Sequence, residues 1–134
     1  MAKPEVTLPD AERILIARLA GVATTVSTSY PDVTLTGTNT HLQVELENSD
    51  TSDYPVAERA QVRITGHAAP GKRTAVKTLM SDVLRELYTH PGNADLAGIV
   101  VRLGRSDVTE DPDTHNLMCW VLVQANLKAT PVAP

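Results

Sequence analysis

The 134-residue chain contains no phenylalanine, one tryptophan and three tyrosines, so its core must be built from valine, leucine, isoleucine and alanine. Its single cysteine, Cys119, excludes an intrachain disulfide, argues against a cysteine-based zinc site, and fits a reducing compartment. The net charge of −4 lacks the basic excess that non-specific binding of nucleic acid requires. The longest apolar run near the N-terminus, residues 14–17, is too short for a signal peptide or a bilayer span.

What is present is ordinary for a soluble globular protein: 42% of the residues are apolar and 21% are charged. The length fits one domain with one core. We therefore expect a single domain over residues 1–134. Residues 1–8 should form an extended arm, and residues 128–134 a flexible, proline-containing tail.

Two segments have the spacing of amphipathic helices. Residues 10–20 start with Asp10 after a proline, repeat apolar residues at helical spacing and stop at Gly21. Residues 71–89 carry the longer apolar stripe, and a Pro-Gly-Asn turn at 91–93 ends them. The members of this stripe are Val76, Leu79, Met80, Val83, Leu84 and Leu87.

Strands are expected between and after these helices. β-Branched composition favours strands at 22–30 and 33–36, and alternation favours strands at 41–47 and 59–66. Apolar segments at 99–103 and 117–127 complete the set. Runs of strands between two helices predict an α+β fold, with an antiparallel sheet of about five to six strands and two helices packed on one face.

The last predicted strand is apolar on both sides. One side carries Leu117, Cys119, Val121 and Val123, and the other carries Met118, Trp120 and Leu122. If the helices cover only one face, Met118, Trp120, Leu122 and Val100 form an apolar patch of the kind that marks an interface. The alternative is that this strand is central and that a helix or loop covers its second face.

Charge is divided along the chain. All charged residues from 45 to 58 are acidic, and all from 59 to 77 are basic, including Arg59, Arg63, Lys72 and Arg73. Opposite patches on one subunit suit head-to-tail contact in a ring, although solvated loops and a solvated helix face give the same pattern.

The loop at 104–116 adds a second acidic cluster, with Glu110, Asp111 and Asp113 as candidate contacts for a basic partner. Its carboxylates lack the spacing of a calcium loop.

No constellation points to catalysis. The four histidines have no metal-ligand spacing with one another or with Cys119, and no nucleophile-elbow sequence occurs. The Gly71-Lys72 pair precedes a helix but lacks phosphate-loop spacing. We expect no enzyme, no catalytic or metal-binding residues and no cofactor.

The order and spacing of five segments are similar to those of tail terminator proteins of long-tailed (siphovirus) phages that infect actinobacteria. These segments are PDAERIL at 9–15, an extended stretch, ERAQVRI at 58–64 leading into the helix at 73–88, the Asp-Pro-Asp loop at 111–113, and MCWVLV at 118–123. The resemblance extends over residues 9–127.

This resemblance implies a virion structural protein in the neck region of the tail, assembled in the host cytoplasm. Six copies would form a ring that caps the head-proximal end of the tail tube, stops its polymerisation and joins the tail to the head. The implied partners are other copies of the chain, the tail tube protein and the head-completion connector protein. DNA would pass through the lumen without specific binding, and no membrane is involved.

Two other functions remain open on the residues. A head-completion or head–tail adaptor protein has a similar size and pattern. A small cytoplasmic ligand-binding regulatory domain belongs to a different class, but it needs a pocket, and the sequence shows no polar cluster to line one.

Overall fold

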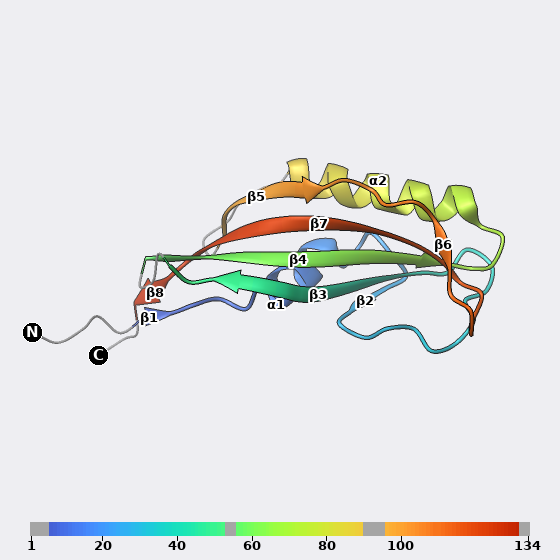
Figure 1. The fold of residues 1–134 in the computed structure, drawn as a ribbon, viewed down its shortest axis with the longest axis horizontal. Coiled ribbons are helices and arrows are strands. Elements are labelled where there is room, and N and C mark those ends of the chain that lie inside the picture. Colours follow the sequence, from blue (N-terminus) through green and yellow to red (C-terminus); the bar gives the residue numbers. More distant parts are fainter. Residues whose placement is uncertain (1–5, 53–55, 90–95, 132–134) are drawn as a thin grey trace, which may run out of the picture.

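The computed structural model describes residues 6–52, 56–89 and 96–131, which form an α+β fold with two helices and a six-stranded sheet (Figure 1). The helices are α1 (Ala11–Leu19) and α2 (Arg73–Thr89). The sheet strands are β2 (Thr25–Ser27), β3 (Thr40–Asp50), β4 (Ala57–Ala68), β5 (Leu96–Leu103), β6 (Thr109–Glu110) and β7 (Leu117–Lys128). Their order is β2-β3-β4-β7-β5, and β6 also pairs with β7.

The α+β class is confirmed, but the sheet is mixed, because β2 lies parallel to β3 while the other pairs are antiparallel. A parallel pair needs a long connection, and residues 28–39 supply it. The strand predicted at 33–36 is therefore wrong: these residues belong to that connection, although their composition favours a strand.

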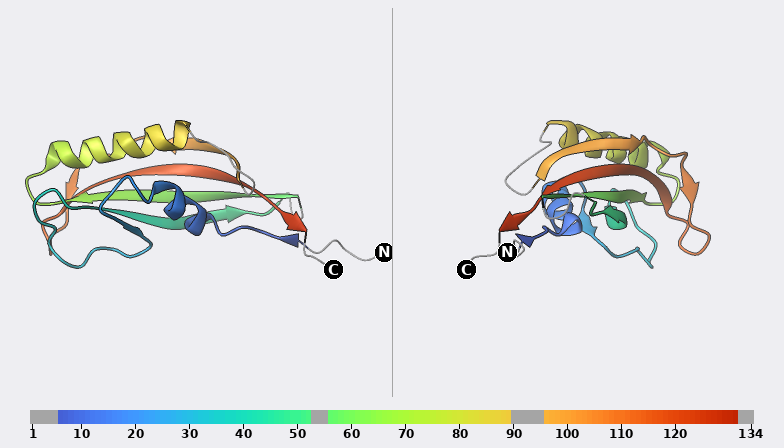
Figure 2. Two further views of the ribbon diagram at one scale, coloured as in Figure 1. Left: turned by 180° about the vertical axis from the view of Figure 1, so that it is seen from behind. Right: turned by 60° about the vertical axis from the view of Figure 1, so that its left-hand side comes forward.

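Both helices pack on the same face of the sheet (Figure 2). Helix α1 begins after Asp10, whose side chain accepts a hydrogen bond from Arg13 N at 3.3 Å, as an N-cap should. It buries Ala11, Leu15 and Leu19. Helix α2 buries the predicted stripe, except that Leu84 is only partly buried.

The strands fill the other side of the same core. Alternate residues of β3, β4 and β7 point toward the helices and are fully buried. They include Leu42, Val44, Val62, Ile64, Val121 and Val123. Val62 and Ile64 thus face inward, as predicted.

Several strands are longer than predicted. β3 reaches Asp50, but a bulge between Leu46 and Asn48 makes Glu47 an extra residue and ends the strict alternation. Thr130–Pro131 forms β8 and pairs with β1 (Val6–Thr7), so the predicted tail and arm contain a two-stranded sheet. The turn expected at 91–93 lies outside the described residues, as do 1–5, 53–55 and 132–134.

Candidate assembly surface

The face of the sheet opposite the helices, called here the open face, is built from residues that alternate with the core positions. Register places Gln43, Thr65 and Trp120 in one row across β3, β4 and β7. The next row contains Glu45, Arg63 and Leu122, and the row after that contains Gln61, Gln124 and Val100. Met118, Trp120, Leu122 and Val100 therefore share this face, as the sequence predicts.

The centre of the open face is not a bare apolar patch. The guanidinium carbon of Arg63 lies 4.4 Å from the centroid of the Trp120 ring, close enough for a cation–π contact. Arg63 Nε in turn lies 2.5 Å from Glu47 Oε1. Trp120 is thus half-buried beneath an ion pair, which leaves a mixed surface of the kind found in protein interfaces.

The connection 28–39 covers one end of the open face. At that end the alternative from the sequence analysis holds, in which a loop covers the second face of the last strand. The Tyr30 hydroxyl donates a hydrogen bond to Asp111 Oδ2, and its oxygen also lies 3.1 Å from Met118 Sδ. The Tyr30 ring makes an edge-on contact with His67, with centroids 5.2 Å apart. Met118 is therefore partly withdrawn from the predicted patch.

His67 is fully buried beneath this loop. Neither ring nitrogen has a hydrogen-bond partner among the described residues. Burial and the neighbouring His41 lower the pKa of His67 to about 4, while Asp111 acts in the opposite direction. His41 is satisfied, because its Nδ1 lies 2.6 Å from Thr25 Oγ1 and its Nε2 lies 2.8 Å from Ser29 O.

The acidic loop separates into structural and exposed members. Asp111 is only 4% exposed, and its Oδ1 accepts hydrogen bonds from the backbone N–H groups of Asp113 and Thr114 at 2.8 and 3.2 Å. The hydrogen bond from Tyr30, followed by these backbone donors, lowers the pKa of Asp111. Asp111 thus orders the loop and offers little to a partner, whereas Glu110 and Asp113 are exposed.

A neighbouring asparagine ties the same two loops together. Asn116 Oδ1 accepts from Leu35 N at 2.8 Å, and Asn116 Nδ2 donates to Val33 O at 2.9 Å. Thr34 adds a hydroxyl contact to Thr114 O at 2.9 Å. The connection 28–39 is therefore held against the loop before β7.

Strand β5 carries three exposed apolar residues, of which the sequence analysis identified only Val100. Val100, Val101 and Leu103 are 44%, 45% and 52% exposed. The register with β7 places Val101 on the helix face. A bulge between Val101 and Leu103 then places Leu103 on the open face. In the sequence, the signal that could have identified Val101 and Leu103 is that apolar residues occupy both sides of this strand.

The structure corrects the prediction of separate acidic and basic patches. Because β3 and β4 are antiparallel neighbours, Asp50 pairs with Arg59 and Glu45 pairs with Arg63 in the register. The two charge runs therefore lie side by side and partly neutralise each other. Lys72 and Arg73 lie apart from them, in the exposed segment that opens α2.

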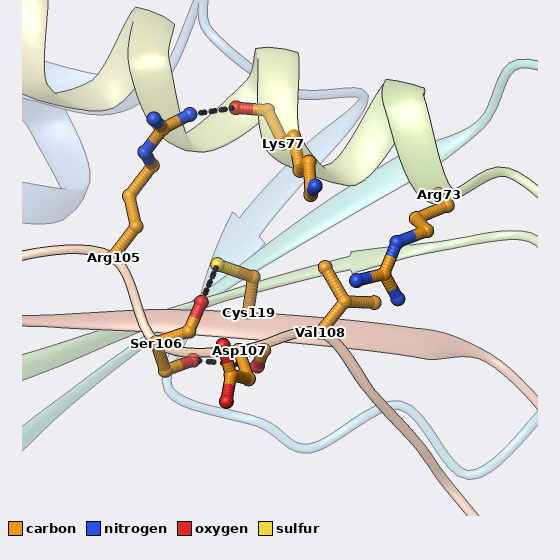
Figure 3. Close-up of a pocket in the computed structure, with 7 residues that line it drawn as sticks. All are labelled: Arg73, Lys77, Arg105, Ser106, Asp107, Val108 and Cys119. Atoms are coloured by element: carbon orange, nitrogen blue, oxygen red, sulfur yellow. Dashed lines mark hydrogen bonds between the residues drawn. The ribbon is translucent and has the colours of Figure 1, made fainter.

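Arg73 belongs to a pocket of about 210 Å³ between the start of α2 and the connection from β5 to β6 (Figure 3). Its lining includes Lys77, Arg105 and Asp107, with Cys119 at its base. Arg105 Nη1 reaches Ser81 Oγ at 2.9 Å and Lys77 O at 3.4 Å. The pocket is thus cationic, with one carboxylate on its rim.

Cys119 is buried, and its Sγ lies 3.3 Å from Ser106 O. No group of three potential metal ligands occurs within the described ranges. Within the same ranges, no helix has the length and apolar character needed to cross a membrane.

Comparisons with known proteins give likenesses in structure and none in sequence. No family model matches the chain, and no curated protein matches it. A solved chain from the virion of a native gene transfer agent (GTA) particle has a similar fold, with a TM-score of 0.58 and 16% sequence identity. The match covers 88% of this chain and 87% of that chain. At this identity the likeness establishes a shared fold.

Proposed function

We propose that the protein is a virion structural protein and, within that class, a tail terminator. Copies of the chain would form a ring, with six copies as the expected number. The ring would cap the head-proximal end of the tail tube, stop its polymerisation and join the tail to the head connector. No cofactor and no catalytic step belong to this role.

The observation that carries the proposal is the fold shared with a chain of a GTA virion particle over nearly the whole length of both chains. The order of segments that resembles tail terminators is an independent argument from sequence. The surface is compatible with assembly, because β5 exposes three apolar side chains and the open face carries a Trp120–Arg63 centre.

A head-completion or head–tail adaptor protein is the alternative within the same class. It would use the same fold but contact the portal side of the neck. The small regulatory domain has one observation in its favour, the cationic pocket that Arg73 and Arg105 line.

A stop codon in this gene of the parent phage separates these functions. Negative-stain microscopy of the lysate should show abnormally long, headless tails beside DNA-filled heads if the protein is a terminator. Tails of normal length that fail to join heads would assign it to the adaptor class. Normal infectious particles would refute both structural functions.

A further inference from the structure

The two outer edges of the sheet differ in a way that suits contact between copies. One edge is β5, whose outer side pairs with no strand in the described part of the chain. The other is residues 44–50 of β3, because β2 pairs only with residues 41–43. We infer that β5 of one subunit pairs with the free part of β3 of the next subunit, so that the sheet continues from copy to copy.

The central part of β5, residues 98–101, lacks the devices that keep an edge from pairing. Bulges interrupt the pairing of β5 with β7 on both sides of this part, and Arg102 is the one charged residue of the strand, but residues 98–101 contain no proline, no charged side chain and no bulge. Val100, Val101 and Leu103 are exposed on its two faces. Soluble proteins normally protect such an edge with charge, proline or a covering segment, so a bare apolar edge indicates one that a partner strand covers.

The free part of β3 is a matching surface. Leu46 is 45% exposed and lies on the helix face, the face to which Val101 also belongs. Leu46 N donates to Glu12 Oε2 at 3.0 Å, so a flexible side chain of α1 holds an edge donor that an arriving strand can take. A continuous sheet would bring the two apolar side chains to the same side of the junction.

Charge favours joining unlike edges over joining two copies of β5. Glu45, Glu47 and Asp50 lie on the free part of β3, although Glu47 is already paired with Arg63. β5 and the residues after it carry Arg102 and Arg105, and the cationic pocket adjoins them. Unlike edges make a heterologous contact, which repeats in one direction and closes into a ring when the rotation allows.

This inference rests on the proposed function, and the test separates the two. Particles are assembled with the full chain carrying Leu46→Cys, Val101→Cys or both, and are treated with a short bismaleimide crosslinker. Native Cys119 is buried, so particles of the unchanged chain give the background. We expect a ladder of crosslinked multimers from the double variant and no multimers from either single variant.

Two results would overturn the inference while leaving the proposed function intact. Dimers from Val101→Cys alone would indicate β5–β5 pairing. A double variant that is present in particles but gives no multimers would exclude the junction. Absence of the unchanged protein from purified particles would instead refute the proposed function, and with it the inference.

A second pair of variants applies if a cysteine substitution prevents assembly. Val101→Asp places a charge on the β5 edge, and Val33→Asp places the same charge on an exposed loop residue away from both edges. We expect both to fold with unchanged thermal midpoints, and only Val33→Asp to enter particles. Incorporation of Val101→Asp at the level of Val33→Asp would contradict the junction.

Discussion

At the scale of single residues, His67 makes the stability of the fold depend on pH. Its pKa is about 4 in the folded chain and about 6.5 when unfolded, so the unfolded chain binds more protons between these values. His67 thus lends stability that is fully present above pH 6.5 and is lost as the pH falls to 4. The shift corresponds to about 3 kcal/mol of unfolding free energy.

Urea unfolding monitored by circular dichroism between pH 7 and pH 4 measures this loss. His67→Phe replaces the ring with one that does not titrate, and should flatten the slope. His115→Gln changes an exposed histidine and should keep the slope of the unchanged chain. Equal slopes in the two variants would show that His67 does not cause the dependence.

Tyr30 joins the connection 28–39 to the acidic loop through one hydroxyl. Tyr30→Phe keeps the ring against His67 but removes the hydroxyl that donates to Asp111 and contacts Met118. A hydrogen bond to a charged carboxylate contributes about 1.5–3 kcal/mol, so the unfolding free energy should fall by about that amount. Tyr88→Phe is the matched control, because Tyr88 is 89% exposed, and chemical denaturation should give it the unchanged value.

At the scale of elements, helix α2 approaches β4 closely at Gly66. A Cβ atom there would lie 2.5 Å from Met80 Sδ and 3.0 Å from Leu79 Cδ2. Gly66→Ala therefore forces α2 or its side chains to shift, and we expect a loss of about 1–2 kcal/mol. Gly98→Ala, in strand β5, meets no atom within 4 Å and should leave the thermal midpoint unchanged or slightly higher.

The elements that the sequence predicted well are those with long, uninterrupted periodicity. The stripe from Val76 to Leu87 identified α2, and the apolar run on both sides of the last strand identified β7. The connection 28–39 was read wrongly, because its β-branched residues favour a strand locally. Its structure depends instead on distant partners such as Asn116 and Asp111, which no local pattern reveals.

The candidate surface was predictable only as a set of residues on one face. Alternation placed Met118, Trp120 and Leu122 together correctly. It could not show that Arg63 covers Trp120, because that contact depends on which strands are neighbours. The exposure of β5 also depends on its place at the sheet edge, which strand order alone decides.

At the scale of the whole molecule, the antiparallel pairing of β3 with β4 decides how the acidic run at 45–58 and the basic run at 59–77 are arranged in space. Acidic and basic stretches that are separate in sequence become adjacent strands, as Glu47 and Arg63 show. The remaining unlike surfaces are the two sheet edges, one acidic on β3 and one basic beside β5. In the proposed contact between subunits, polarity would thus follow from the fold more than from the order of charges along the chain.

The balance of charge also bears on DNA, which would pass through the lumen of the proposed ring. With a net charge of −4, the subunit lacks the basic excess that non-specific binding of DNA requires. We expect duplex DNA to bind more weakly than about 10⁻⁴ M at physiological salt, as measured by fluorescence anisotropy. Micromolar binding that falls steeply with salt, and that Arg105→Glu abolishes, would instead make the cationic pocket a DNA-backbone contact, and the lumen would then grip DNA and oppose its passage.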